Sequence, residues 1–304
     1  MIKILITILI GAVLLLSGCA QKLPDDEQSN SASAELPSLH IINNVSYSSL
    51  AALSYTDSSI RLTYGTEPLQ YGQLYLPQTA TMPVKAPLVV FIHGGCWLNA
   101  YDISHSRAFS QALAAEGFAV WSLEYRRTGD SGGGWPGSFT DVLAGISSVP
   151  SLLSGYPIDS NNIVLAGHSA GGQLALLAAG KSYHQPVLSG LPAIKGVVGL
   201  AAITDMPGYS VGNNSCQQAT HQFLQGSAEQ QPEYYLQANP QQQAMHPKTM
   251  LLHGTTDSIV PLAQASGSGM PFQLVADAGH FDWIHPQTLA YKKFIATLQE
   301  LFAQ

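Results

Sequence analysis

The feature that most constrains this chain is the stretch 161–180, whose sequence is NNIVLAGHSAGGQLALLAAG. The apolar segment Ile163–Ala166 predicts a short strand, and the small and aliphatic residues after Gly171 predict a helix. Between them lies a G-x-S-x-G pattern centred on Ser169. A strand, a tight turn and a helix are the setting of a nucleophile elbow, which holds a serine hydroxyl out of the end of a sheet. Ser169 is therefore the candidate nucleophile.

The same pattern occurs a second time, at 208–212, with Ser210 at its centre. This copy follows Met206-Pro207 and precedes the polar run Asn213-Asn214-Ser215. It lacks both the apolar strand before the serine and the helix after it. We therefore predict that Ser210 lies in a loop and has no catalytic role.

From Ile60 onward, strand and helix patterns alternate. Strands are predicted at Leu69–Leu76, Leu88–Ile92, Phe118–Leu123, Ile163–Ala166, Ile194–Ala201, Thr249–Leu252 and Phe272–Val275, and helices at Ser104–Glu116, Phe139–Leu153 and Gln287–Phe302. The first strand alternates and stops at Pro77, which is typical of an edge strand. Repeated β–α units predict an α/β fold, with a mostly parallel central sheet and helices on both faces.

Residues 39–304 are predicted to form this single domain. The polar, Gln-rich region at about 205–247 is expected to be an excursion above the sheet. The segment 39–59 is weakly patterned; one helix is expected at Tyr47–Tyr55, with no assigned role.

A serine hydroxyl needs a base to accept its proton and a third group to orient that base. Asp257 follows the predicted strand Thr249–Leu252, and His280 follows the predicted strand Phe272–Val275. We predict that Asp257 orients His280 and that His280 accepts the proton of Ser169.

Other residues compete for these roles. Asp205 and Asp277 are alternative acids, and Asp205 is the stronger of the two because it follows a strand predicted to lie nearer the elbow. His285 is an alternative base, but it precedes Pro286 at a predicted helix start, where a capping role is favoured.

An oxyanion hole is expected where the buried strand Leu88–Ile92 runs into His93-Gly94-Gly95-Cys96-Trp97. The backbone N–H groups of this glycine turn, together with that of Ala170 at the helix start, are expected to stabilise the negative charge on the substrate oxygen. Trp97 is expected either to wall a substrate pocket or to pack in the interior.

These motifs resemble the esterase and lipase branch of the α/β-hydrolases. The similarity is greatest to hormone-sensitive-lipase-like carboxylesterases and to kynurenine-formamidase-like enzymes with an HGGxW loop. The resemblance spans about Ile60 to the C-terminus and implies hydrolysis of small carboxylic esters without a metal or cofactor. It places the oxyanion donors at Gly95, Cys96 and Ala170. The chain departs from the HGGG form by having Cys96 at the third glycine.

The first residues predict export. Lys3 precedes an apolar run, Ile4–Leu16, which is shorter than a membrane span and has the length of a signal-peptide core. The following Leu16-Ser17-Gly18-Cys19 resembles a bacterial lipobox, which implies removal of residues 1–18 and lipidation of Cys19. Residues 19–38 would then be the lipidated cysteine and a flexible tether. Ala20 resembles the pattern that sorts lipoproteins to the outer membrane, so we expect a lipid-anchored protein of the bacterial cell envelope that faces the periplasm or the surface.

Cys96 and Cys216 are the only other cysteines. In an oxidising compartment such a pair can form a disulfide, and two separate thiols are the alternative. Both readings are open from the sequence. A bridge would pin the loop that ends at Cys216 beside the loop that carries Cys96.

The composition and motifs exclude several classes. The formal net charge is −7 and no basic cluster is present, which argues against a nucleic-acid partner. The histidines lack the H-x-H and H-x-x-x-H spacings of metal sites, and no phosphate-binding loop occurs, so no metal or cofactor is expected.

Three functions fit these motifs. Ester hydrolysis through an acyl-enzyme is favoured; amide or peptide hydrolysis by the same triad is the alternative; a non-catalytic binding scaffold is disfavoured because the triad looks intact. The natural ester and the oligomeric state are left open.

Overall fold

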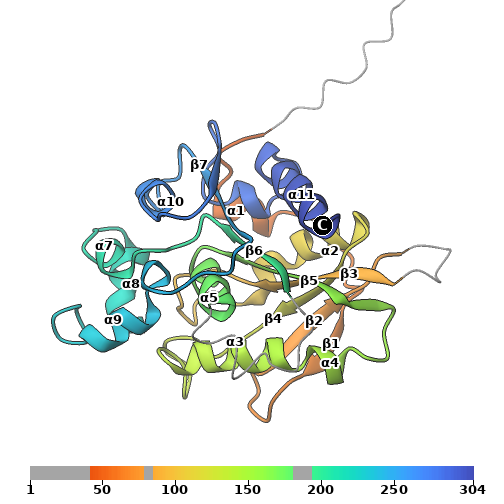
Figure 1. The fold of residues 1–304 in the computed structure, drawn as a ribbon, viewed down its shortest axis with the longest axis horizontal. Helices are drawn as coiled ribbons and strands as arrows, with labels where there is room; N and C mark the ends of the chain where they lie inside the picture. Colours follow the sequence, from red (N-terminus) through yellow and green to blue (C-terminus); the bar gives the residue numbers. More distant parts are fainter. Residues whose placement is uncertain (1–41, 79–84, 181–193) are drawn as a thin grey trace, which may run out of the picture. The chain divides into compact units, whose positions relative to one another are not determined.

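The computed structural model describes residues 42–78, 85–180 and 194–304. Within these ranges, eight strands form one sheet in the order β1-β2-β4-β3-β5-β6-β7-β8 (Figure 1). The pairs β1–β2 and β2–β4 are antiparallel, and all the other pairs are parallel. The predicted α/β fold with a mostly parallel sheet is confirmed. The predicted signal peptide, the tether and Cys19 lie outside the described residues.

The strands are β1 (Ile60–Thr63), β2 (Tyr71–Tyr75), β3 (Ala86–Ile92), β4 (Ala119–Leu123), β5 (Ile158–His168), β6 (Ile194–Leu200), β7 (Thr249–Gly254) and β8 (Phe272–Val275). The α-helices are α1 (Tyr47–Ala51), α2 (Arg107–Ala115), α3 (Gly137–Ser147), α4 (Val149–Leu152), α5 (Ala170–Ala179), α7 (Met206–Ser210), α8 (Ser215–Phe223), α9 (Pro232–Ala238), α10 (Ala263–Ser266) and α11 (Leu289–Phe302). Short 3-10 helices are η1 (Ile103–Ser106), η2 (Pro240–Gln242) and η3 (Asp282–Ile284).

Strand β3 shows how the sheet divides the core into two layers. Its side chains alternate between the faces, so Val90 and Ile92 enter one apolar cluster while Val89 and Phe91 enter the other. All four are fully buried, as expected for a parallel strand covered on both sides.

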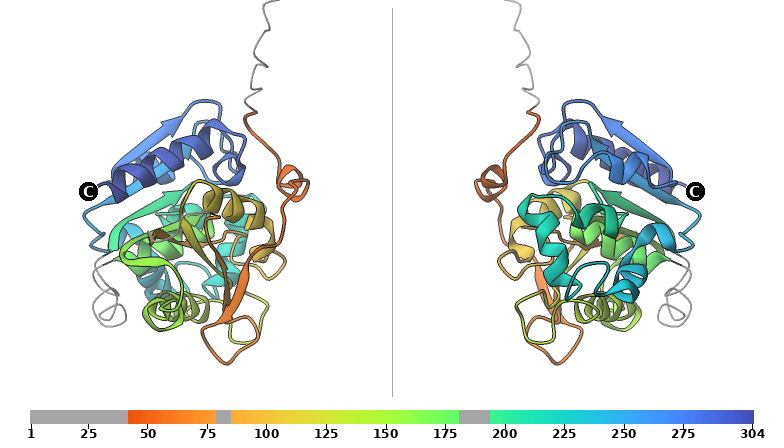
Figure 2. Two further views of the ribbon diagram at one scale, coloured as in Figure 1. Left: turned by 90° about the vertical axis from the view of Figure 1, so that its right-hand side faces the viewer. Right: turned by 90° about the vertical axis from the view of Figure 1, so that its left-hand side faces the viewer.

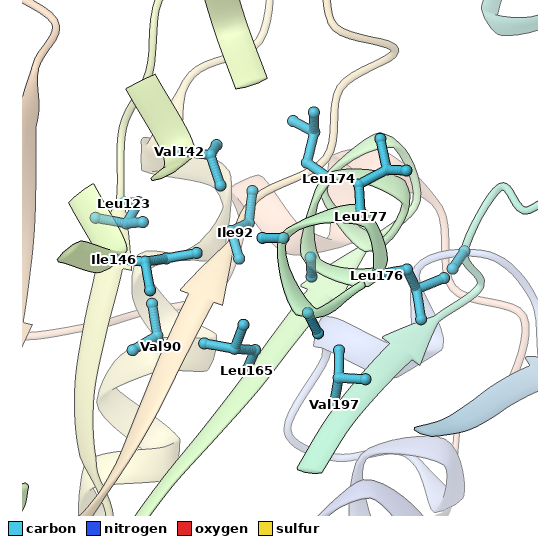
Figure 3. Close-up of a cluster of buried hydrophobic side chains, with 14 of the residues drawn as sticks. Val90, Ile92, Leu123, Val142, Ile146, Leu165, Leu174, Leu176, Leu177 and Val197 are labelled. Carbon is cyan, nitrogen blue, oxygen red and sulfur yellow. The ribbon is translucent and has the colours of Figure 1, made fainter. Parts of the chain in front are cut away.

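Helices α3 and α5 cover one face, and helices α2 and α11 cover the other; Figure 2 shows α3 and α11 on opposite sides of the sheet. In the first layer, Leu174 and Leu177 of α5 pack with Val142 and Ile146 of α3 over the strands, as Figure 3 shows. Every residue of α5 is buried, which fixes the helix that follows Ser169.

The strand predicted at Leu69–Leu76 is not at the edge of the sheet. It is β2, and it lies between β4 and a further strand, β1, which the sequence analysis missed. β1 is short and largely exposed, and Arg61 at its centre faces Gln73 of β2 across the ladder. With only four residues, Ile60-Arg61-Leu62-Thr63, the alternation is too short to identify a strand from the sequence alone.

Two further predictions need correction. Helix α1 ends at Ala51 rather than Tyr55. The second G-x-S-x-G copy is not a loop: it lies largely in α7, where Asp205 is the N-cap and its side chain accepts a hydrogen bond from the N–H of Gly208. A proline at the start of a helix is favourable, which explains why Met206-Pro207 begins one.

The region between β6 and β7 carries α7, α8 and α9, which lie together at the left of Figure 1. Among the described helices, none is both long and apolar enough to cross a bilayer.

Candidate active site

Ser169 stands at a sharp turn between β5 and α5. Its backbone has φ 56° and ψ −119°, a conformation that side chains rarely adopt, and its N–H donates to the carbonyl of Leu200 at 2.8 Å. A Cβ at Gly167 would lie 2.1 Å from the carbonyl oxygen of Gly171. A Cβ at Gly171 would lie 2.2 Å from the carbonyl oxygen of Ile92. The two glycines of the motif are therefore required by the close approach of backbone on both sides of the turn.

Replacing Gly171 with alanine is expected to destabilise the protein by about 3 kcal/mol or more, because the clashing atoms are backbone of β3 that cannot rotate away. Thermal or urea unfolding would measure the loss. Gly155→Ala is the matched control, since a Cβ there meets nothing within 4 Å. Equal stability of the two variants would contradict this account of the elbow.

The structure brings Asp257 and His280 together. Nδ1 of His280 lies 2.8 Å from Oδ2 of Asp257. The other carboxylate oxygen, Oδ1, accepts the N–H groups of Ile259 and Val260 at 2.9 and 2.8 Å. Asp257 is thus held at both oxygens, and it orients the imidazole through Nδ1–H. Nε2 is the other ring nitrogen of His280, and no hydrogen bond to it occurs among the described residues.

The competing residues lie elsewhere. Asp205 caps α7, and Asp277 is exposed with its N–H donating to Thr255 Oγ1. His285 is buried at the end of η3, where its Nδ1 accepts the N–H of Gln287. No hydrogen bond joins any of the three to His280 or Ser169 in the part of the chain that the structure describes.

The ionisation state of Asp257 is consistent with the roles predicted for Asp257 and His280. Burial alone would raise the pKa of Asp257, but the His280 imidazole and the N–H of Val260 hold that pKa below its ordinary value. Asp257 is therefore ionised at neutral pH and presents a negative charge to Nδ1 of His280. Ser169 and His280 line the same cavity, although no hydrogen bond links their side chains among the described residues.

His168, which the sequence analysis did not single out, lies directly beneath the candidate base. Its Nε2–H donates to the carbonyl of His280 at 2.9 Å, and the two rings are 4.6 Å apart between centroids. Burial, and next the nearby His280, lower the pKa of His168 well below its ordinary value, so this ring stays neutral. It supports the backbone of His280 without competing for its proton.

Buried histidines make the folded state sensitive to acid. Burial lowers the pKa of His105 to about 4 and also lowers that of His168, whereas both titrate near 6.5 when unfolded. Below pH 6.5 the unfolded chain therefore binds protons that the folded chain does not, and each such proton reduces the unfolding free energy by about 1.4 kcal/mol per pH unit. We expect stability to fall steadily from pH 6.5 toward 4.

Urea unfolding at a series of pH values would test this. His105→Phe removes one of the protons, so its stability should decline less steeply than that of the wild type between pH 6 and 4.5. Parallel curves for the two proteins would rule out His105 as a source of the acid sensitivity.

The loop after β3, where the oxyanion hole is predicted, has an unusual backbone conformation. Gly95 has φ 115° and Cys96 has φ 54°. Within the described residues, no hydrogen bond uses the N–H of Gly95, Cys96 or Ala170. A Cβ on the preceding Gly94 would lie 3.1 Å from Cβ of Ser169, which shows how closely this loop approaches the candidate nucleophile.

Trp97 does not wall the pocket. It is fully buried, its Nε1 donates to Gln173 at 3.0 Å, and its ring stacks on Phe223 with centroids 4.7 Å apart. Its side chain belongs to the apolar cluster that includes Val90 and Ile92. Of the two roles the sequence allowed, the interior one is observed.

Buried charges fix the same loop from behind. Glu124 accepts the N–H of Ile103 at 3.0 Å and pairs with Nε2 of His93 at 3.1 Å. Arg127 donates to the carbonyl of Tyr101 at 2.7 Å. These bonds make Glu124 and Arg127 part of the framework beneath the cavity.

The cavity in front of Ser169 has a volume of about 290 Å³. It is lined by Tyr47, Gly95, Cys96, Tyr101, His105, His168, Ser169, Asn214, Ser215, Cys216, Ile259, His280 and Phe281. Three of the lining rings are in contact, since Tyr47 packs edge-on against Tyr101 and Phe281. Its lining is mostly apolar around a few polar groups, as in small-molecule sites.

Tyr47 gives the segment 42–59, the described part of the weakly patterned stretch, a place in the site. The N–H groups of Asn44 and Val45 donate to the carboxylate of Asp282, each at 2.7 Å. Oδ2 of Asp282 also accepts the N–H of Gly279, next to His280. The segment before α1 is thereby held against the loop that carries the candidate base.

A disulfide joins Cys96 to Cys216, with Cα atoms 5.0 Å apart. Of the two readings that the sequence left open, the structure has the bridge. It connects the oxyanion loop to α8 at the wall of the cavity. No group of three or more metal-ligating side chains occurs among the described residues.

The sheet order and the elbow define the class: the chain is an α/β-hydrolase of the esterase and lipase branch, as its resemblance implied. The chain belongs to the BD-FAE family, whose model matches residues 73–267.

Two curated relatives illustrate the similarity. Esterase LipC of Mycobacterium tuberculosis is 27% identical over 215 residues, which cover 67% of this chain and 52% of that protein. A probable isoprenylcysteine alpha-carbonyl methylesterase of Oryza sativa subsp. japonica, ICME, is 26% identical over 221 residues, 66% of this chain and 50% of that protein. The chain thus spans about half the length of the curated relatives it matches.

Solved structures share the fold. Esterase B from Lactobacillus rhamnosis has a TM-score of 0.67 at 19% identity, over 84% of this chain and 90% of that one. A truncated carbohydrate esterase from gut microbiota also has a TM-score of 0.67, at 21% identity, over 82% of this chain and 97% of that one.

Proposed function

We propose that this protein hydrolyses carboxylic esters through a serine acyl-enzyme. The observation that carries the proposal is that one cavity is lined by Ser169, by His280 and by the loop of Gly95 and Cys96, while Asp257 binds His280 from behind. The esterase names of the relatives support the same activity.

The reaction begins with Ser169. Its Oγ attacks the ester carbonyl carbon, and its proton passes to Nε2 of His280. Asp257 stabilises the imidazolium that forms. His280 then gives the proton to the leaving alcohol, and the acyl group stays on Ser169. A water molecule, deprotonated by His280, releases the acid and restores the serine.

The negative oxygen of each tetrahedral intermediate is stabilised by backbone donors. The N–H groups of Gly95, Cys96 and Ala170 are the donors we assign, because they are adjacent to Ser169 and carry no other hydrogen bond within the described ranges. One such donor contributes about 2.7–4 kcal/mol to lowering the barrier. Cysteine at the third position of the loop still supplies its backbone N–H.

The cavity volume predicts the size of the substrate. About 290 Å³ is at the low end for ligand sites, so we expect short esters to be preferred. The test is hydrolysis of p-nitrophenyl acetate, butyrate, octanoate and decanoate by the full chain in mild detergent. We expect kcat/KM to be highest for acetate or butyrate and to fall at least tenfold for decanoate.

Other outcomes would redirect the proposal. A preference for decanoate would contradict the short-ester specificity but leave ester hydrolysis in place. Turnover of anilides or formamides without ester turnover would favour amide hydrolysis. Absence of any turnover by folded protein would favour a binding scaffold.

We also propose that the protein is a lipoprotein of the bacterial cell envelope, anchored through Cys19. The lipobox-like sequence and the length of the preceding apolar run support this. Several acyl chains on one residue suffice for stable anchoring. Full-length protein expressed in a Gram-negative host should incorporate labelled palmitate, and Cys19→Ser should not. Absence of label from the wild type would contradict lipid anchoring.

A further inference from the structure

The oxyanion loop adopts a conformation that its own residues do not favour. Gly95, Cys96 and Trp97 all have positive φ, at 115°, 54° and 58°. Two of the three carry a Cβ, so surrounding contacts must hold the loop. Trp97 is held by its stacking on Phe223 and its hydrogen bond to Gln173. Cys96 is buried, and its side chain is covalently tied by the disulfide to Cys216.

Cys216 lies at the start of α8, which is itself fixed to the loop of the catalytic acid. Asn214 caps this helix through a capping box with Gln217. The side-chain amide of Asn214 donates to the carbonyl of Ile259 at 2.9 Å. The N–H of Ile259 in turn donates to Oδ1 of Asp257 at 2.9 Å. The disulfide and these hydrogen bonds therefore form a continuous connection from Cys96 through the start of α8 to Asp257.

We propose that Cys216 is a positioning residue for the proposed ester hydrolysis. Its disulfide holds the N–H of Cys96 in the oxyanion hole, and it fixes the position of that hole relative to the loop that carries Asp257. Neither sulfur takes part in the chemistry. The bridge acts on the transition state, because the N–H of Cys96 matters most when the substrate oxygen is negative. This inference rests on the proposed function.

The bridge is also within reach of a reductant, since both cysteines line the cavity. A small dithiol would reduce it by thiol–disulfide exchange. Two electrons and two protons pass to the protein, giving the thiols of Cys96 and Cys216, while the dithiol is oxidised to its own disulfide. Activity should therefore fall on reduction and return on reoxidation.

The test compares wild type with Cys216→Ser and with Gln218→Ala, a control on the exposed side of the same helix that keeps the bridge. Three quantities are measured: kcat and KM for p-nitrophenyl acetate, and the inhibition constant of a trifluoromethyl ketone, which forms a tetrahedral adduct with a serine. A donor displaced by about 1 Å can cost up to about a hundredfold in rate. For Cys216→Ser we expect kcat about 10- to 100-fold lower, KM within threefold, and inhibition weakened by the same factor as kcat/KM.

Gln218→Ala should match wild type in all three. If Cys216→Ser instead keeps wild-type kcat and inhibition while mass spectrometry shows no bridge, the inference is wrong. A higher KM with unchanged kcat would also overturn it, because the bridge would then shape the pocket rather than the oxyanion hole.

Reduction of the wild type covers the case in which the variant does not fold. The same three measurements are made on dithiol-treated protein whose circular dichroism remains native, and the same loss is expected. Full activity in the reduced protein would contradict the inference. Failure of the proposed function has a different signature, namely no ester turnover by the oxidised wild type.

Discussion

Replacing Ser169 with alanine is expected to lower kcat/KM for p-nitrophenyl acetate by about 10⁵-fold, because the proposed acyl-enzyme forms on the hydroxyl oxygen of this residue. The small residual rate would come from binding and from the oxyanion donors, which the substitution leaves in place. Inhibition by an organophosphonate should disappear in the same variant, since its covalent adduct requires the serine oxygen.

The chain supplies its own matched control. Ser210 occupies the centre of the second G-x-S-x-G pattern, but in α7 its hydroxyl donates to the carbonyl of Pro207 at 2.9 Å. Ser210→Ala should keep activity within twofold of wild type. A large loss in this variant with none in Ser169→Ala would exchange the two assignments.

The backbone at Ser169 adds a test of stability. A residue with φ 56° and ψ −119° costs about 1–3 kcal/mol relative to glycine, which adopts this region readily. Ser169→Gly should therefore be inactive and yet more stable than wild type to urea, whereas Ser169→Ala should gain little. Equal stability of the glycine and alanine variants would show that the turn is not strained.

The sequence was sufficient for the sheet and the elbow because local pattern and fold agree there. The apolar run before Ser169 and the small residues after it allow one arrangement, and Gly171 proves to face backbone at 2.2 Å. Strand β1 was missed for the opposite reason. It is short and mostly exposed, and it is held by pairing with β2 rather than by burial.

The sequence distinguished less clearly between the two candidate catalytic acids, Asp205 and Asp257. Asp205 and Asp257 both follow parallel strands, so both reach the same edge of the sheet. What separates them is local: Asp205 turns back to cap α7, while Asp257 receives two backbone N–H groups and faces His280. Such choices depend on loop geometry, which has no periodic signal.

Contacts between segments far apart in the chain could not be predicted from the sequence either. The position of Tyr47 in the cavity depends on Asp282 binding the backbone before α1, more than 230 residues away in the chain. No motif marks that contact. Trp97 shows a related limit, because its interior position is seen in contacts with Phe223 and Gln173, which are distant in the chain.

Asp257→Asn is expected to lower kcat by about 10³- to 10⁴-fold with little change in KM. Oδ1 of Asp257 accepts two backbone N–H groups, so the carbonyl oxygen of an asparagine would take that place. Its NH₂ would then face Nδ1 of His280, at the position where Oδ2 now accepts. An amide N–H can only donate there, so the imidazole would carry its proton on Nε2 and could not accept one from Ser169.

Asp205→Asn is the control that separates the loss of kcat in Asp257→Asn from a general effect of replacing an aspartate at this edge of the sheet. Asparagine is as good an N-cap as aspartate, so α7 should remain intact and kcat should stay within twofold of wild type. Raising the pH should not rescue Asp257→Asn, because the proton on Nε2 is fixed by the amide and not by titration of the ring. If Asp205→Asn were the slower enzyme, Asp205 would be the catalytic acid, and the hydrogen bond between Asp257 and His280 would be structural only.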